Sequence, residues 1–257
     1  MKKVIDFLSA YRGGVVLLSG GNDSLALCLL AKEVFKKNYI CITIKYPYTP
    51  SWTLKRAEEL AKKFKLKHKV VEMNLPYELK ENQPLRCYWC KKYMFKKAAE
   101  FAKKNWVLLE GSTLGEEGRN GLRAAWEEGV ISPFIETNIG KEEVLSFLKE
   151  KGITPAPPDT CLLTRLPFRK KVDLNVIEKL DRLEESVRKL VFTTVRARLH
   201  EENLIRLEAD AKDIDKIFSH RKEILKTGRK LGFSFITVDL EGYREGSMWL
   251  TAKKLKG

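Results

Sequence analysis

Short apolar runs alternate with amphipathic segments through the first part of the chain. Strand-like runs, made up mostly of apolar residues, lie at Val15–Leu18, Ile40–Ile44, Lys69–Val71 and Trp106–Leu109. Segments with helical periodicity separate them, at Ser24–Lys37, Ser51–Phe64 and Lys91–Lys104. Strands that alternate with helices are typical of a parallel, doubly wound sheet. The pattern therefore predicts an α/β domain over residues 1–169.

The pattern changes after Gly152, where the proline-rich stretch TPAPPDTC at residues 154–161 predicts a rigid connector. An α+β layout follows, which predicts a second, smaller domain over residues 170–257. Its expected elements are a helix at Asn175–Leu190, alternating runs at Phe192–Leu199 and Leu204–Ala209, a charged helix at Ile214–Leu231 and a strand at Phe233–Asp239.

Basic residues outnumber acidic ones, with 49 Lys and Arg against 34 Asp and Glu and a formal net charge of +15. Such an excess favours anionic ligands such as nucleotides or nucleic acid. A solvated, lysine-rich surface explains it equally well, because the lysines are spread along helical faces. Abundant Lys and Glu beside a single Gln are typical of thermophilic proteins.

The start of the chain does not resemble a signal peptide, because Asp6 interrupts the place of an apolar core. The sequence also has no apolar stretch of the roughly 18 residues that a membrane-spanning helix needs. We therefore expect a cytoplasmic protein with no membrane partner, in which thiols stay reduced. Its five cysteines then indicate metal binding, catalysis or packing rather than disulfides.

The segment between the first expected strand and helix reads SGGNDS at residues 19–24. A loop that enters a helix N-terminus presents free N–H groups and the positive end of the helix dipole, which suit an anion. Its two glycines allow a ligand close to the backbone, and its two serines add hydroxyl donors. Asp23 adds a carboxylate suited to a metal ion. A glycine-rich turn without a ligand is the alternative.

Three of the cysteines lie in segments that suggest chemistry. Cys87 and Cys90 in RCYWCKK have a spacing that binds one metal centre or forms a redox pair, and Cys161 lies in the connector. Three thiolates can hold three irons of a 4Fe–4S cluster and leave the fourth iron open. Zinc and unpaired structural thiols are the alternatives. Cys28 and Cys41 are expected to be buried packing residues.

Basic residues alternate in the expected strand VRARLH at residues 195–200. Because side chains on a strand alternate with a period of two, Arg196, Arg198 and His200 share one face. Arginine binds phosphate or carboxylate in a bidentate manner, so this face is a candidate anion site. A solvated outer face is the alternative.

The loop at residues 19–24 is neither a Walker A motif nor a GxGxxG motif. Ser-Gly-Gly-x-Asp-Ser after a first strand instead resembles the PP-loop of ATP pyrophosphatases, which split ATP into AMP and pyrophosphate. The resemblance implies a Rossmann-like PP-loop domain. It also implies that the loop cradles pyrophosphate and that Asp23 helps to hold Mg²⁺.

Further segments, taken in order, are similar to one family of that superfamily, the ATP-dependent sacrificial sulfur transferases of LarE type. The similarity is nearly full length. It covers the PP-loop, RCYWCK at residues 86–91, GLRAA at 121–125, residues 161–167, the strand with Arg196 and Arg198, RLE at 206–208 and residues 239–248.

The resemblance implies that ATP adenylylates a carboxylate of an anionic pyridinium dicarboxylate mononucleotide and releases pyrophosphate. A sulfur nucleophile then displaces AMP and leaves a thiocarboxylate. Family members with the connector cysteine alone give up its sulfur once, whereas members that also have the Cys-x-x-Cys pair resemble cluster enzymes. We expect the cluster version here, with single use of Cys161 as the alternative.

The resemblance also implies the cofactors, the assembly and the site residues. The cofactors are ATP, Mg²⁺ held by Asp23 and a 4Fe–4S cluster, and family members form trimers or hexamers. The expected catalytic residues are Cys87, Cys90, Cys161 and Asp23, with the three cysteines as cluster ligands. The expected cofactor- and substrate-binding residues are Ser19, Gly20, Gly21, Asn22, Asp23, Ser24, Gly111, Arg123, Arg196 and Arg198.

Some positions depart from the family pattern. Residues 110–113 read EGST where Asp-Gly-Thr-Asn is usual, and Leu199-His200 stands in place of His-His. Asn22 replaces a common valine and Leu25 a common serine. The first two departures lie where nucleotide or substrate could touch, so they leave the sulfur acceptor open more than they affect ATP use.

Other functions remain open at this level. A tRNA thiolase also combines a PP-loop with three cysteines, and the net charge suits tRNA, although no separate RNA-binding module accompanies the motif. A non-catalytic iron–sulfur or nucleotide-sensing protein would bind ATP without releasing pyrophosphate. An ammonia-using ligase related to NAD synthetases leaves the three cysteines unexplained.

Overall fold

The computed structural model describes residues 1–191, 194–201 and 203–244, which form two compact units. The expected strand at 192–199 begins, and the family-like segment at 239–248 ends, outside these ranges. The sequence pattern places the domain boundary at residue 170, whereas the contacts assign the chain from Pro157 onward to the second unit. The first unit comprises Met1–Tyr46, Trp52–Tyr77 and Leu85–Ala156, and the second adds Pro47–Ser51 and Glu78–Pro84 to the later residues.

The first unit is built on a parallel sheet with the strand order β3-β2-β1-β4, which confirms the predicted α/β class. The central strand, β1, is buried along its whole length, as a strand covered on both faces requires. Its Val15 pairs with Ile40 of β2 and Leu108 of β4. The strands are β1 (Gly14–Leu17), β2 (Tyr39–Lys45), β3 (His68–Glu72) and β4 (Val107–Leu109).

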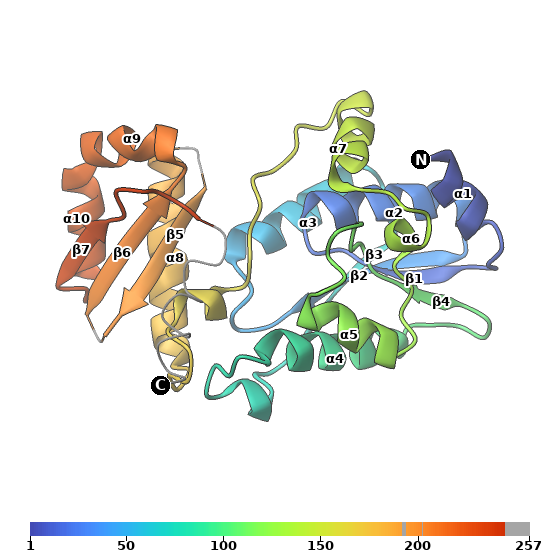
Figure 1. Cartoon of the computed structure of the whole chain (residues 1–257), viewed down its shortest axis with the longest axis horizontal. Helices are drawn as coiled ribbons and strands as arrows, with labels where there is room; N and C mark the ends of the chain where they lie inside the picture. The colour runs from blue at the N-terminus through green and yellow to red at the C-terminus, as the bar shows by residue number, and fades with distance from the viewer. Residues whose placement is uncertain (192–193, 202, 245–257) are drawn as a thin grey trace. The chain divides into compact units, whose positions relative to one another are not determined.

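Helices cover both faces of this sheet (Figure 1). On one face α2 (Asn22–Phe35) packs with α1 (Lys2–Leu8) and α7 (Lys141–Glu150), and on the other α4 (Arg86–Ala99) packs with α5 (Asn120–Glu127). Cys28 and Cys41 are fully buried, which confirms their expected place in the core. The remaining helices here are α3 (Ser51–Lys63) and α6 (Pro133–Glu136). The 3₁₀ turn η1 (Tyr77–Leu79) begins at the last residue of the stretch Trp52–Tyr77 and otherwise belongs to the second unit.

The order of the strands creates a switch point in the first sheet. The chain passes from β1 to β2 and β3 at one edge and then returns to place β4 on the other side of β1. Connections that leave neighbouring strands in opposite directions open a crevice at the carboxyl ends of those strands, where α/β proteins bind ligands. The loop at residues 19–24 follows β1 at this point.

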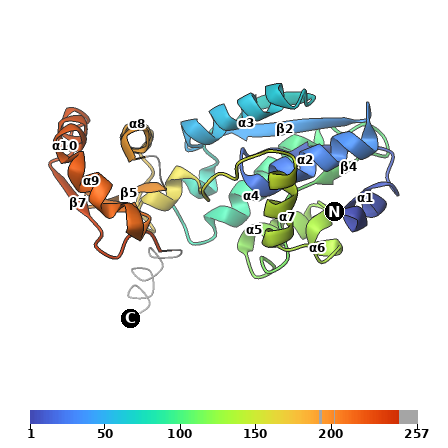
Figure 2. The same cartoon turned by 90° about the horizontal axis from the view of Figure 1, so that it is seen from above.

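The second unit has a three-stranded sheet in which β6 (Leu204–Ala209) pairs antiparallel with β5 (Val195–His200) and parallel with β7 (Phe235–Val238). Helix α8 (Leu174–Val191) packs against β5, and α10 (Arg221–Lys230) packs against α8. The expected single helix at 214–231 is two helices, because α9 (Ile214–Ser219) ends before His220 (Figure 2). Two 3₁₀ turns, η2 (Leu162–Arg165) and η3 (Ala211–Asp213), complete the α+β unit.

The early stretches of the second unit are bonded to its late residues. The Leu162 N–H donates to the Tyr48 carbonyl at 3.0 Å. Asn82, which is fully buried with a φ of +47°, donates from Nδ2 to the Leu166 carbonyl at 3.2 Å and to the Pro167 carbonyl at 2.9 Å. The second unit is therefore assembled from pieces that are distant in the sequence.

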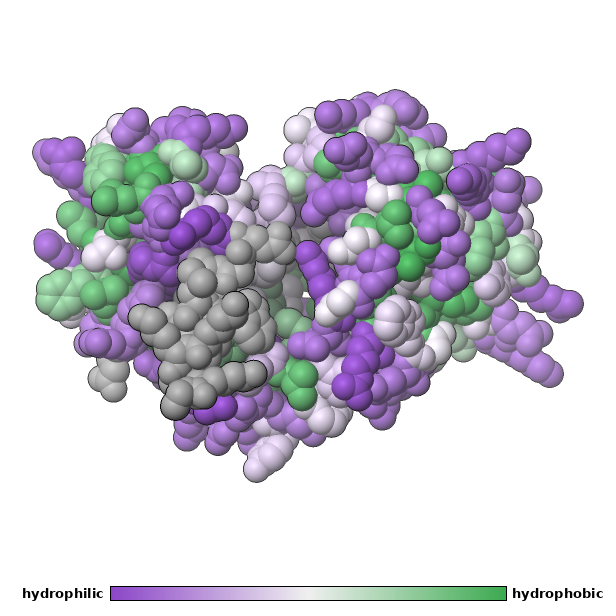
Figure 3. Space-filling view, viewed as in Figure 1, coloured by the Kyte–Doolittle hydropathy of each residue, from purple (hydrophilic) through white to green (hydrophobic). Residues whose placement is uncertain are grey.

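Hydrophilic side chains predominate on the face shown in Figure 3, in keeping with the charged composition. None of the helices in the described ranges is both long enough and apolar enough to cross a membrane.

Candidate active site

The loop at residues 19–24 is closed by its own hydrogen bonds. The Ser19 N–H donates to Ser24 Oγ at 3.1 Å, and Ser24 Oγ donates to the Gly21 carbonyl at 3.1 Å. Helix α2 begins directly after Gly21, and no side chain caps it. The N–H groups of its first turn are therefore left for water or an anionic ligand.

Helix α3 shapes the same loop through Gly20. Gly20 has a φ of +84°, and a Cβ at this position would lie 2.3 Å from the Thr53 carbonyl oxygen of α3. Arg56, one turn further along α3, donates from Nε to the Gly20 carbonyl at 2.9 Å. The close approach requires glycine at position 20. The sequence pattern did not single out Arg56, because its contact joins segments that are distant in the sequence.

Gly111 lies against the start of α2, beside Asp23 and Ser24. Its expected part in nucleotide binding stays a prediction. A Cβ on Gly111 would lie 3.0 Å from both the carbonyl carbon of Asp23 and the backbone nitrogen of Ser24. The loops that follow β1 and β4 therefore meet at this glycine. Asn22, by contrast, directs its side chain to the backbone of Ala156.

Asp23 presents the unpaired carboxylate oxygen of the loop. Its Oδ1 is buried and has no hydrogen-bond partner among the described residues. Burial raises the pKa of Asp23, Lys141 of α7 lowers it and Glu116 raises it, with a net rise. A buried carboxylate oxygen without a partner is costly and suits a divalent cation, which takes carboxylate and phosphate oxygens together. The residues therefore fit Mg²⁺, and Lys141 is a nearby cation that the sequence analysis missed.

The Cys-x-x-Cys pair lies near the start of α4. Cys87 is exposed and Cys90 is half-buried, and neither forms a disulfide among the described residues. Tyr46, which directly follows β2, donates from Oη to the Cys90 carbonyl at 3.3 Å. The neighbouring Lys91 donates to Glu110 Oε2 at 3.1 Å. These bonds connect the cysteine-bearing turn to the residues that follow β2 and β4.

Glu110 holds the loop that contains Gly111. Its buried carboxylate accepts hydrogen bonds from Lys91, Ser132 and both the N–H and the hydroxyl of Ser112. Burial raises the pKa of Glu110, but Lys91 and the hydroxyl donors outweigh burial and lower it overall. This departure from the family pattern thus has a clear structural role.

Arg123 lies on α5 in an exposed cluster with α4. Its Nε donates to Glu127 Oε1 at 2.9 Å, and its guanidinium lies 5.3 Å from the centroid of the Tyr88 ring. Hydrogen bonds from Tyr88, Lys92 and Arg123 lower the pKa of Glu127 to about 2. The expected contact of Arg123 with substrate stays a prediction.

Cys161 lies in the second unit, directly before η2; it is half-buried and forms no disulfide among the described residues. Arg165, which has no solvent exposure, fixes this segment. It pairs with Asp159 at 2.8 Å and with Glu184 of α8 at 2.6 Å. Thr164 Oγ1 donates to the Cys161 carbonyl at 2.8 Å. The backbone on both sides of Cys161 is therefore held by buried polar contacts.

The two arginines of β5 also bind this segment. Arg196 pairs with Asp159 Oδ1 at 2.9 Å, and Arg198 donates to the Thr164 carbonyl at 2.7 Å and to Glu208 Oε2 at 3.0 Å. Burial lowers the pKa of both guanidinium groups. The structure thus gives each arginine a structural partner within the unit. Their binding of a substrate anion stays a prediction.

The proposed cluster ligands fall in different units, with Cys87 and Cys90 in the first and Cys161 in the second. Across residues 1–191, 194–201 and 203–244, no group of three or more His, Cys, Asp and Glu side chains is gathered to hold a metal ion. Cys87 and Cys90 lie about one turn apart on α4. The three-ligand 4Fe–4S cluster stays a prediction.

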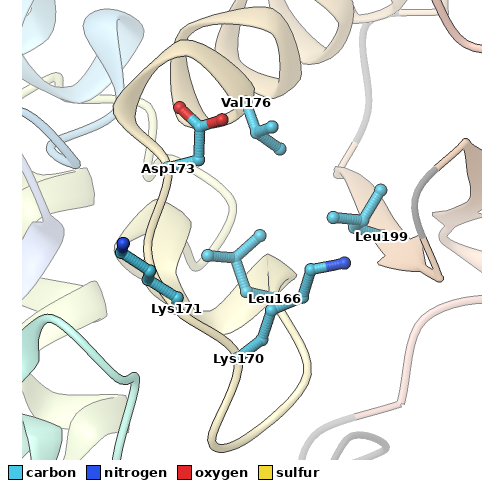
Figure 4. Close-up of a pocket in the computed structure, with 6 residues that line it drawn as sticks. All are labelled: Leu166, Lys170, Lys171, Asp173, Val176 and Leu199. Atoms are coloured by element: carbon cyan, nitrogen blue, oxygen red, sulfur yellow. The ribbon is translucent and has the colours of Figure 1, made fainter.

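A cavity of about 220 Å³ lies in the second unit (Figure 4). Its wall includes apolar side chains from η2's flank, α8 and β5, and Lys170 at its edge donates to the Glu201 carbonyl at 2.9 Å. None of the expected site residues lines it. The lining residues are Leu166, Lys170, Lys171, Asp173, Val176 and Leu199.

Comparison with known proteins adds four findings. The family described as "Queuosine biosynthesis protein QueC" matches residues 13–98. An uncharacterized protein of Methanocaldococcus jannaschii is 37% identical over 234 residues, which is 90% of each chain. An uncharacterized protein of Synechocystis is 28% identical over 259 residues, or 96% of each chain. Pyridinium-3,5-bisthiocarboxylic acid mononucleotide synthase of Lactiplantibacillus plantarum is 27% identical over 244 residues, 91% of this chain and 87% of that one.

Proposed function

The chain belongs to the LarE-type family of the PP-loop superfamily, and we propose that it is an ATP-dependent sulfur transferase that converts a substrate carboxylate to a thiocarboxylate. The observation that carries the proposal is Asp23, whose buried Oδ1 has no partner in the described chain and lies in an uncapped helix N-terminus. This arrangement suits a magnesium-bound polyphosphate.

In the first proposed step, a substrate carboxylate oxygen attacks the α-phosphorus of ATP. The bond between that phosphorus and the bridging oxygen breaks, and pyrophosphate leaves. The N–H groups at the start of α2 would take the phosphate oxygens, Asp23 would hold Mg²⁺, and Lys141 would neutralise charge nearby. Magnesium supplies charge stabilisation for the leaving pyrophosphate.

In the second proposed step, a sulfur nucleophile attacks the acyl carbon, the bond to the adenylate oxygen breaks, and AMP leaves. Adenylylation makes this step feasible because AMP is a good leaving group and sulfur is a strong nucleophile at neutral pH. A 4Fe–4S cluster on Cys87, Cys90 and Cys161 would supply a transferable sulfide. The half-buried, held position of Cys161 also supports its use as a single-use donor.

The substrate class that we propose is an anionic pyridinium dicarboxylate mononucleotide. Support comes from the name of the Lactiplantibacillus relative and from the basic composition of the chain. A tRNA acceptor is the alternative, which the combination of a PP-loop with three cysteines and the net charge of the chain would also suit.

The test starts with protein purified without oxygen and analysed for iron and acid-labile sulfide. About four irons per chain are expected for the cluster. The protein is then incubated with ATP, Mg²⁺ and pyridinium-3,5-dicarboxylic acid mononucleotide, and pyrophosphate and the product mass are measured. We expect acceptor-dependent pyrophosphate release and replacement of oxygen by sulfur.

A Cys161→Ser variant separates the two steps, because it should release pyrophosphate and form no thiocarboxylate. Iron-free protein that loses one sulfur from Cys161 during the reaction would replace the cluster with single-use donation. Absence of pyrophosphate release with the mononucleotide and with tRNA would overturn the proposed function.

A further inference from the structure

The first residue of α2 is bonded to the connector that leads to Cys161. Asn22 Nδ2 donates to the Ala156 carbonyl at 2.9 Å, and the Ala156 N–H donates to Asn22 Oδ1 at 2.9 Å. The side-chain amide of Asn22 is therefore bonded through both its NH₂ and its oxygen, and Ala156 is bonded through both its carbonyl and its N–H. Both residues belong to the first unit, and Ala156 is its last residue.

The connector is stiff on both sides of this contact. Pro155 precedes Ala156, and Pro157 and Pro158 follow it, so ring closure restricts φ at three of these four positions. A residue that is pinned within such a stretch sets the direction of the chain that follows. Cys161 is five residues beyond Ala156, and an extended chain of that length reaches at most about 18 Å.

We infer that Asn22 is a positioning residue that ties the sulfur-bearing connector to the nucleotide-binding helix. The inference rests on the proposed function. While the acyl adenylate is bound at the start of α2, the tether keeps Cys161 within the length of five residues from that helix. A valine at this position has no polar side-chain atoms and would form neither bond.

Hydrogen exchange at Ala156 tests the tether directly. The three neighbouring prolines have no N–H, so Ala156 carries the single exchangeable backbone amide between residues 155 and 158. In the full-length protein we expect Asn22→Val to accelerate exchange of this amide at least tenfold. Asn22→Asp keeps the acceptor for the Ala156 N–H and should accelerate it less. Asn175→Val, the same change at an exposed asparagine in the first turn of α8, is the control and should leave it unchanged.

The functional readout is the number of sulfur atoms transferred for each pyrophosphate released. This ratio is independent of any change in the rate of adenylylation. We expect Asn22→Val to lower the ratio at least fivefold, because untethered protein loses the adenylate to water, and Asn22→Asp to restore part of it. An unchanged ratio, or unchanged exchange at Ala156, would overturn the inference. If wild-type protein releases no pyrophosphate, the proposed function fails, and the exchange experiment still decides whether the tether exists.

Discussion

Asp23 in the first unit and Asp159 in the second are half-buried residues with buried carboxylate oxygens, in segments that the sequence marks as functional, but their surroundings differ. Asp159 has Arg165 and Arg196 as ion-pair partners. Burial raises its pKa, but these two guanidinium groups lower it overall. Asp23 Oδ1 is buried without a hydrogen-bond partner among the described residues, and burial raises the pKa of Asp23 overall although Lys141, its own backbone N–H and Arg119 lower it.

The difference shows how a structural charge can be told from a ligand-binding one. A buried carboxylate that the protein itself pairs helps to hold the backbone in place. A buried carboxylate that the protein leaves unpaired costs folding energy, which a bound cation can offset. Three predictions test this contrast between the two aspartates.

The largest effect on stability is expected from Arg165→Met. This change leaves the buried carboxylates of Asp159 and Glu184 without their shared partner. Removing one member of a buried ion pair costs about 3–5 kcal/mol, and we expect this loss in the free energy of unfolding measured by urea titration.

The matched control is Arg182→Met. Arg182 pairs with Glu178 at 3.8 Å on the exposed side of α8, and its side chain is 61% exposed. An exposed pair contributes about 0–1 kcal/mol. Equal losses in the two variants would contradict the structural role of Arg165.

The second prediction concerns Asp23→Ala, which should impair the reaction and not the stability of the fold. Pyrophosphate release should fall on the order of a hundredfold or more, because the magnesium-bound phosphates lose a ligand. The free energy of unfolding should stay the same or rise, since a buried unpaired charge is removed. Asp6→Ala, at an exposed aspartate of α1, is the control for both measurements. A large loss of stability without loss of pyrophosphate release would reverse the assigned role.

The smallest effects are expected in the pH dependence of the two carboxyls. The lowered pKa of Asp159 means that its contribution to stability is complete above the ordinary value of 3.8 and is lost as the pH falls through the lowered value. The raised pKa of Asp23 has the opposite sign: its ionisation costs stability as the pH rises through the raised value.

Carbon-13 NMR titration of aspartate carboxyls measures both shifts, with Asp23→Asn used for assignment. Adding Mg²⁺ should lower the pKa of Asp23 and leave that of Asp159 unchanged. If Mg²⁺ changed the pKa of both carboxyls, or of neither, the proposed difference between the two aspartates would be wrong.

The elements that form through local periodicity could be predicted from the sequence. The four parallel strands coincide with the four predicted strand runs, and the pattern is clearest in β1, which is buried along its whole length and therefore apolar throughout. The short helices α1, α5, α6 and α7 were missed, since each offers few turns in which a pattern can repeat. The division of the last helical stretch at His220 likewise leaves little trace in its periodicity.

The residues of the candidate site could likewise be predicted only where a local sequence pattern marks them. The loop at residues 19–24 could be predicted because its glycines and serines follow an apolar run and precede a helical pattern, whereas Gly111 is expected from the family resemblance alone. Lys141, Arg56 and the pair of Arg165 with Glu184 could not, because their roles arise from contacts between distant segments. Glu184 stands among charged residues of α8 and resembles a solvated position, although it is 2% exposed.

The segmented composition of the second unit has a consequence for synthesis on the ribosome. Asn82 and its partner Leu166 are 84 residues apart. Tyr48 likewise accepts a hydrogen bond from Leu162, which is synthesised much later. The stretches at 47–51 and 78–84 leave the ribosome while the first unit is being made, and their partners follow only after that unit is complete. These early stretches are thus synthesised before the first unit is complete, but they can be packed only after the late residues of the second unit have been made. A cut after Ala156 would not release a self-sufficient first domain, because it would leave both early stretches permanently without the chain that covers them.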